Sequence, residues 1–379
     1  MPVNKRIMIV CGEPSGDLHA GALARELLKR NPELTIEGVG GDHLRSSAAH
    51  IIADIRELAA FGLFNVITKL PRFLSLKKRL LERIRRQPYE AVILVDFSGF
   101  NLRLARELPE ELPVFYYISP QIWASRPGRI RTVKQHIKKM IVLFPFEEEF
   151  YRSHEVPVAC VGHPLLDIVR PSLDKKVFQQ TYGLNTQEPI CALLAGSRES
   201  EIKHILPVMA QAALHMREHF PSMQFIIAQA ANLATRIYTR ILEDEGISAK
   251  LIQGKPYDCI NAADLCLVAS GTATLETAII GKPFLIIYRM DMLNYLLYRP
   301  QIKIPYIGMV NIVAGKRLVP EFVQFQAKPE AIAGAGLALL RSPEKRVAMQ
   351  EALQRVTSLL GTPGAAGRAA EIILNDLAS

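Results

Sequence analysis

The sequence predicts an α/β fold with two doubly wound domains that face a central cleft, and three observations support this prediction. The chain has 379 residues, which is too long for one ordinary core and suits two domains of about 150–200 residues. Short β-rich runs alternate with helix-patterned segments, which indicates parallel sheets covered by helices. This alternation occurs twice, on either side of a polar, strand-poor stretch at residues 170–189.

The expected strands follow in order along each half. In the first half they are residues 6–10, 36–40, 91–96, 114–119, 140–144 and 158–162. In the second half they are residues 190–196, 224–230, 249–254, 265–270 and 284–289. Each half opens with a strand that runs into a glycine-containing loop and a helix, so we expect ligands at the carboxyl ends of the strands.

The domain boundaries follow from the same pattern. We expect an N-terminal domain at residues 1–170, a second domain at 171–345 and C-terminal helices at 346–379. After the glycine-rich sequence GTPGAAG, the segment RAAEIILNDLA has the pattern of a final helix.

The composition excludes several classes of protein. Apolar residues make up 49% and charged residues 22%, as in ordinary globular proteins. The apolar runs are far shorter than the roughly 18 residues of a membrane span, and the N-terminus lacks the pattern of a signal peptide. We therefore expect a cytoplasmic protein. The five cysteines form no C-x-x-C pair, so buried reduced thiols and no structural metal are expected. No cofactor is expected either.

The loop after residues 190–196 is a candidate phosphate site. Gly196 and Ser197 lie where a strand gives way to a helix, so their backbone N–H groups and the helix dipole favour an anion. Arg198 adds a guanidinium that suits two phosphate oxygens. The alternative is a helix cap in which Arg198 pairs with Glu199 or Glu201.

A second loop has the same character. Ser270, Gly271 and Thr272 offer hydroxyls and open backbone at another helix start, and Glu276 lies about one turn further on. Its carboxylate suits two ribose hydroxyls, so the pair of loops suits a nucleotide diphosphate. The alternative is a capping box between Thr272 and Glu276. Neither loop matches the dinucleotide or P-loop motif.

The first half offers carboxylates at strand ends. Asp96 follows four apolar residues, where its side chain can point into a crevice and accept a proton from an attacking hydroxyl. The alternative is that Asp96 caps the next helix. Glu13 follows the first strand, and His163 follows the last, where it can reach the cleft or serve a structural role.

Positive charge is concentrated in one segment. The chain carries a net charge of +9, and residues 56–88 hold nine basic against two acidic residues, a local charge of +7. A basic amphipathic helix of this kind can lie on an anionic membrane, although its apolar face can instead pack on the sheet. No nucleic-acid signature accompanies it, so nucleic acid is not expected. The expected membrane contacts are Phe61, Phe64, Val66, Ile67, Lys69, Leu70, Arg72, Phe73, Leu74, Lys77 and Lys78.

The ordered set of motifs resembles a known family. GEPSGD, VDFSGFN, YISPQIWASR, FPFE, VGHPL, GSRESEI, SGTATLE and NIVAGKRLVPE occur in the order, and near the spacing, of lipid A disaccharide synthases. Together they span residues 12–321. SGTATLE alone also resembles other glycosyltransferases of the GT-B type, which have two Rossmann-like domains.

The resemblance implies an inverting, metal-independent transferase. It implies that UDP-2,3-diacylglucosamine is joined to 2,3-diacylglucosamine 1-phosphate through a β-1,6 linkage, with release of UDP, at the cytoplasmic face of the Gram-negative inner membrane. Both substrates are acylated, so the enzyme must reach lipids whose acyl chains remain in the bilayer. A basic amphipathic helix that contacts the membrane would serve this purpose. A homodimer is a further expected assembly, and the final helix is expected to return to the first domain.

Carried over by motif, the resemblance also implies site residues. Asp96 is the expected base, and the expected acceptor or cleft residues are Glu13, Ser15, Gly16 and His163. The UDP-sugar is expected against Gly196, Ser197, Arg198, Ser270, Gly271, Thr272, Glu276 and Asn311. Three positions depart from the family pattern: Ser125 replaces a tryptophan, and Ala195 and Val310 replace prolines beside Arg198 and Asn311.

Two other functions fit the same features. One is a UDP-sugar epimerase or hydrolase on the same scaffold, which would turn over the donor without an acceptor. The other is a non-catalytic protein that binds a nucleotide sugar and docks on membranes.

Overall fold

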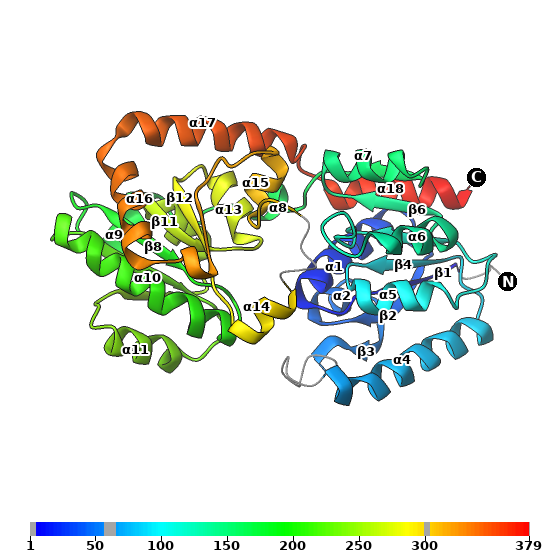
Figure 1. The fold of residues 1–379 in the computed structure, drawn as a ribbon. Coiled ribbons are helices and arrows are strands. Elements are labelled where there is room, and N and C mark those ends of the chain that lie inside the picture. The colour runs from blue at the N-terminus through cyan, green and yellow to red at the C-terminus, as the bar shows by residue number, and fades with distance from the viewer. Residues whose placement is uncertain (1–4, 57–65, 299–303, 379) are drawn as a thin grey trace. The chain divides into compact units, whose positions relative to one another are not determined.

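The computed structural model describes residues 5–56, 66–298 and 304–378. The chain forms two compact units, drawn in Figure 1. Unit 1 comprises Met1–Pro164 and Leu360–Ser379, and unit 2 comprises Leu165–Leu359. The C-terminal segment therefore belongs to the same unit as the N-terminus.

Unit 1 is built on a parallel sheet of seven strands with the order β3-β2-β1-β4-β5-β6-β7. The strands are β1 (Arg6–Val10), β2 (Thr35–Gly40), β3 (His50–Asp54), β4 (Ala91–Val95), β5 (Val114–Tyr117), β6 (Lys139–Val142) and β7 (Val158–Cys160). The helices are α1 (Pro14–Arg30), α2 (Asp42–Arg45), α4 (Val66–Arg86), α5 (Ser98–Ala105), α6 (Ile130–His136), α7 (Pro145–Ser153) and α18 (Ala365–Ala378), with a 3₁₀ turn at Pro127–Arg129.

Unit 2 is built on a parallel sheet of six strands with the order β10-β9-β8-β11-β12-β13. The strands are β8 (Ile190–Leu194), β9 (Gln224–Gln229), β10 (Lys250–Gln253), β11 (Leu265–Ala269), β12 (Phe284–Tyr288) and β13 (Glu321–Val323). The helices are α8 (Leu165–Ile168), α9 (Lys175–Thr181), α10 (Glu199–His219), α11 (Thr235–Asp244), α12 (Pro256–Ala262), α13 (Ala273–Ile280), α14 (Met292–Tyr298), α15 (Met309–Ala314), α16 (Pro329–Arg341) and α17 (Pro343–Leu359), with the 3₁₀ turn η3 at Gln324–Gln326.

The prediction of two doubly wound parallel sheets is confirmed. Every expected strand is present, and all of them except β7 and β10 lie in the interior of their sheets, as continuous apolar runs indicate. The strands β3 and β13 were not predicted; both lie at the edges of their sheets, and β13 has only three residues. The cysteines are free thiols as expected, four of them buried and Cys160 half-buried.

The C-terminal helix α18 is held within unit 1. It packs along α1, and Lys139 forms an ion pair with Asp376 at 2.6 Å. The Arg368 guanidinium donates to the carbonyl oxygen of Val161 at 2.6 Å. Within the described ranges, no helix combines the length and apolar character that crossing a bilayer requires.

Candidate active site

The two sheets place most predicted site residues at equivalent positions. In unit 1 the strand order reverses between β1 and β4, where Val10 pairs with Leu94. In unit 2 it reverses between β8 and β11, where Leu194 pairs with Val268. Open α/β sheets bind ligands outside the carboxyl ends of the strands at such a switch point. The loops that leave these four strands carry Glu13, Asp96, Arg198 and Ser270–Thr272.

Asp96 has an unusual backbone conformation that its neighbours stabilise. Asp96 and Phe97 have φ angles of 49° and 50°, in the left-handed region that non-glycine residues rarely adopt. The buried amide of Asn101 donates to the carbonyl oxygen of Asp96 at 2.8 Å, and the Tyr116 hydroxyl donates to the same oxygen at 2.5 Å. The first residues after β4 are therefore held in a fixed orientation.

The carboxyl group of Asp96 is suited to accept a proton. Burial raises its pKa to about 6, and the negative charge of Glu13 adds to this shift. The alternative role as a helix cap is not supported, because the cap position of α5 belongs to Phe97. Gly16 in the first turn of α1 lies beside Asp96: a Cβ there would be 3.9 Å from the Asp96 Cβ and 3.3 Å from the Cys11 Cβ. Ser15 precedes it on the exposed surface.

His163 lies inside unit 1. Its ring packs on Phe144, with centroids 5.1 Å apart, and only 6% of the residue is exposed. Its backbone N–H donates to the carbonyl oxygen of Leu360 at 2.8 Å, where the C-terminal segment rejoins the unit. Burial, with a smaller effect from His19, lowers the pKa of His163 to about 3, so the imidazole is neutral. These contacts give His163 a structural role at that junction.

In unit 2, the Arg198 loop adopts the capped form that the sequence left open. The Glu201 carboxylate accepts the backbone N–H of Ser197 at 2.9 Å and pairs with the Arg198 guanidinium at 2.9 Å. Gly196 has a φ of +118°, which favours glycine at this turn. The Arg198 side chain remains 61% exposed. Glu201 therefore occupies N–H groups that the sequence suggested for phosphate.

The loop after β11 does not form the alternative capping box. Thr272 occupies the cap position of α13 without a side-chain cap bond, and Glu276 instead accepts the Tyr257 hydroxyl at 3.3 Å. Burial raises the pKa of Glu276. Gly271 has a φ of +147°, and the Ser270 hydroxyl donates to the carbonyl oxygen of Ile307 at 2.9 Å.

The Asn311 side chain, expected near the nucleotide, is engaged within unit 2. Asn311 is fully buried, and its amide donates to Val319 O and to Glu321 Oε1, both at 2.8 Å. Its oxygen accepts the N–H groups of Leu318 and Val319, both at 2.9 Å. Because both polar atoms of this amide are occupied, the Asn311 side chain orders the loop, and a contact of Asn311 with the nucleotide stays a prediction.

Four supporting residues were missed by sequence reasoning. Asn101 and Glu321 were inside the quoted motifs, and each forms a bond within its own motif, to Asp96 and to Asn311, but motif spacing did not show these contacts or those to Val10, Ile307 and Gly308. Tyr116 lay within an expected strand, and Tyr257 lay outside the motifs. Glu321 accepts the backbone N–H groups of Ile307 and Gly308, so it orders the segment that Ser270 contacts.

The expected membrane contacts are only partly described. Phe61 and Phe64 lie outside the described residues, as do the side chains of Val66, Ile67, Lys69 and Leu70. Phe73 packs on Phe97 and Phe100, with centroids 5.9 and 6.1 Å away, so it also serves the core of unit 1. Leu74 is 50% exposed, and Arg72 and Lys78 are exposed, whereas Lys77 pairs with Glu107.

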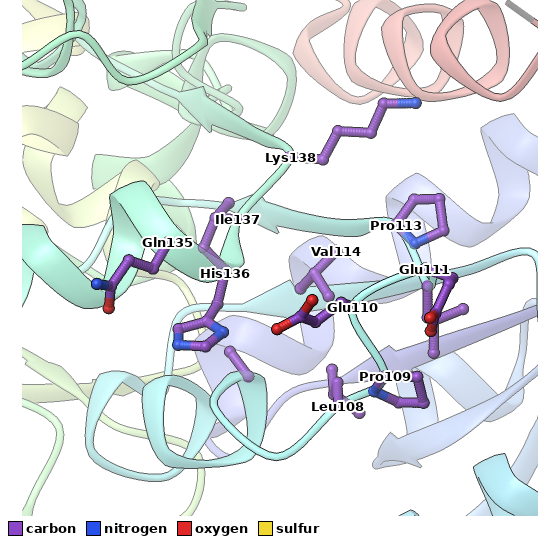
Figure 2. Close-up of a pocket in the computed structure, with 12 residues that line it drawn as sticks. Leu108, Pro109, Glu110, Glu111, Pro113, Val114, Gln135, His136, Ile137 and Lys138 are labelled. Carbon is purple, nitrogen blue, oxygen red and sulfur yellow. The ribbon is translucent and has the colours of Figure 1, made fainter.

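A separate pocket of about 490 Å³ lies elsewhere in unit 1. Figure 2 shows its lining, which includes Glu110, His136 and Lys138. Val114 and Lys138 place it at the amino ends of β5 and β6, the opposite edge from Asp96. It is therefore not part of the candidate active site. Among the residues that the structure describes, no group of three or more His, Cys, Asp or Glu is arranged to hold a metal ion.

Two doubly wound units with polar loops at their switch points define a protein of the GT-B class. Solved structures agree: UDP-GlcNAc 2-epimerase from Neisseria meningitidis bound to UDP-GlcNAc has a TM-score of 0.63 at 14% identity, covering 98% of this chain and 99% of its own. A glycosyltransferase from Rickettsia africae has a TM-score of 0.61 at 13% identity, covering 99% of each chain. At these identities the likeness shows the fold.

The sequence comparisons identify the family. The family model described as lipid-A-disaccharide synthetase matches residues 7–373. The lipid-A-disaccharide synthase of Syntrophus aciditrophicus is 42% identical, covering 98% of this chain and 97% of its own length. That of Myxococcus xanthus is 37% identical, covering 97% of each. This chain belongs to the lipid-A-disaccharide synthase family and is a glycosyltransferase.

Proposed function

We propose that this enzyme joins UDP-2,3-diacylglucosamine to 2,3-diacylglucosamine 1-phosphate through a β-1,6 linkage and releases UDP. The family membership supports the disaccharide-forming reaction, and the fold is shared with a protein bound to UDP-GlcNAc. The observation that carries the proposal is Asp96, which lies at the switch point of unit 1, has its backbone carbonyl oxygen held by Asn101 and Tyr116, and has a carboxyl group of raised pKa.

The proposed step is a direct displacement with Asp96 as general base. The 6-hydroxyl oxygen of the acceptor attacks the anomeric carbon of the donor while the Asp96 carboxylate takes its proton. A new C–O bond forms, the bond to the UDP oxygen breaks, and UDP leaves with the bonding electron pair. One displacement at the anomeric carbon inverts its configuration. A pKa of about 6 leaves Asp96 mostly ionised at neutral pH and a better base than an ordinary aspartate.

Unit 2 is proposed to hold the donor. Arg198 and the helix starts at Gly196–Ser197 and Ser270–Thr272 would bind the diphosphate and stabilise the charge on departing UDP. For the backbone N–H groups of the first loop to take part, phosphate must replace the Glu201 carboxylate that now occupies them. Glu276 would accept ribose hydroxyls, and Glu13, Ser15 and Gly16 would line the acceptor side.

We also propose that the enzyme works at the cytoplasmic face of the inner membrane, with the basic segment against anionic lipid. The local charge of +7 and the exposed Leu74, Arg72 and Lys78 on α4 support this location. We propose in addition that the enzyme forms a homodimer.

The test combines the purified protein with UDP-2,3-diacylglucosamine and the acylated monosaccharide phosphate, followed by mass spectrometry and determination of the new linkage. The expected product is a β-1,6-linked disaccharide phosphate, formed only with both substrates. Donor turnover without acceptor would instead indicate an epimerase or hydrolase. Binding of UDP and vesicles without any product would indicate a non-catalytic protein.

A further inference from the structure

Unit 2 exposes large apolar side chains on two neighbouring segments. Leu296 and Met292 on α14 are 61% and 44% exposed, and Phe325 in η3 is 64% exposed. Single exposed apolar residues are normal on protein surfaces, whereas a group of them marks a binding surface. We call Met292, Tyr295, Leu296 and Phe325 the apolar patch.

The four residues form one surface. Met292, Tyr295 and Leu296 are spaced i, i+3 and i+4, so they share a face of α14. The rings of Tyr295 and Phe325 meet edge to face, with centroids 5.9 Å apart. Hydrogen bonds also join the chain just before α14 to the start of η3. The Gln324 side-chain amide accepts from Met290 N at 3.2 Å and donates to Met290 O at 3.0 Å.

The apolar patch lies at the edge of the sheet that carries the donor loops. Helix α14 follows β12 and η3 follows β13, so both leave the carboxyl edge, as do the loops with Arg198 and Ser270. Strand β12 is the immediate neighbour of β11. Figure 1 shows α14 projecting from the body of unit 2. A sugar bound at the loop after β11 would therefore lie at the same edge of the sheet as the apolar patch.

We propose that the apolar patch binds an acyl chain of the donor sugar. This inference rests on the proposed function, which gives the donor two such chains. Residues 289–303 hold three cations and one anion, a net charge of +2 against +7 in the basic segment, so this part of the sequence offers an anionic bilayer much less attraction than the basic segment does. Four side chains are also far from the roughly 1,200–2,000 Å² that a stable dimer interface buries.

The test measures two dissociation constants on the double variant Leu296→Ser with Phe325→Ser. Long-chain UDP-2,3-diacylglucosamine is one probe and UDP, which has no acyl chain, is the other. The dissociation constant of the acylated donor should rise about ten- to hundredfold, because contacts with apolar surface are lost. That of UDP should stay within about twofold, which also shows that unit 2 is folded.

Two further variants complete the design. Val177→Ser with Val347→Ser removes exposed apolar side chains from α9 and α17 instead, and should bind both probes like the unaltered protein. Leu296→Met with Phe325→Leu keeps the surface apolar and should retain donor affinity. Equal weakening of both probes, no weakening of either, or a loss only of vesicle binding or self-association would overturn the inference. Product formation by the unaltered enzyme tests the proposed function separately.

Discussion

The switch points of the two sheets occupy the same topological position but are built differently. In unit 1, Asp96 has a left-handed backbone, and two buried side chains, Asn101 and Tyr116, bind its carbonyl oxygen. In unit 2, Arg198 is 61% exposed and its loop is closed by the Glu201 carboxylate from the next helical turn. One loop is braced from the core, whereas the other is held by a surface contact.

This difference corresponds to the two chemical tasks that we propose. A general base must lie within hydrogen-bond reach of one proton, so small displacements reduce the rate strongly. A diphosphate has many acceptor oxygens, and a guanidinium on a flexible side chain can adjust to them. The sheet order thus indicates where ligands bind, and the residues around each loop indicate what the loop does.

The largest expected effect comes from Asp96→Asn. Asparagine tolerates the left-handed backbone, so the hydrogen bonds to the carbonyl oxygen of residue 96 should remain while the proton acceptor is lost. We expect kcat to fall by about 10²–10⁴, the usual contribution of general base catalysis, with the dissociation constant of UDP unchanged. Steady-state kinetics and calorimetric titration with UDP measure the two quantities. Substantial remaining activity would remove Asp96 from the role of base.

A smaller and different effect is expected for Arg198→Ala. A charge-assisted hydrogen bond is worth about 1.5–3 kcal/mol, so the dissociation constant of UDP should rise about 10- to 100-fold. Lys203→Ala is the matched control, because Lys203 lies on the same helix and pairs with Glu199 at 2.6 Å. It removes the same charge five residues further along and should change UDP affinity little. Equal losses in the two variants would show a general charge effect rather than phosphate binding.

The sequence was informative where one residue type determines local structure. Buried parallel strands require continuous apolar runs, so the central strands could be located directly. The edge strand β13 has only three residues and gave no such signal. The predicted strand-to-loop junctions of Asp96 and Arg198 are present, each at the carboxyl edge of its sheet, and the roles of the two residues stay predictions.

The partners of these residues could not be predicted, because they depend on tertiary packing. The hydrogen bonds of the Asn311 amide to Val319 and Glu321 could not be predicted from the motif that contains Asn311. The amphipathic pattern led to the prediction that Phe73 contacts lipid, and it did not indicate that Phe97 and Phe100 lie against this ring. An amphipathic pattern shows that one face is apolar and does not show which surface covers that face.

The smallest effect concerns the pH dependence of the base. Asp96 acts only when ionised, so kcat/KM should fall as the pH decreases through about 6. Glu13→Gln removes a negative charge that raises this pKa, so the acid limb should move to lower pH. The shift should be less than about one pH unit, because burial is the larger cause and remains.

Glu26→Gln is the control for this shift. Glu26 lies on the same helix, about 20 Å further along its axis, beyond the screening length at physiological salt. It removes the same charge, so the acid limb should stay where it is in the unaltered enzyme. If the acid limb does not move in Glu13→Gln, or moves equally in both variants, it does not report the ionisation of Asp96. A shift that occurs only in Glu13→Gln would assign the acid limb to the ionisation of Asp96.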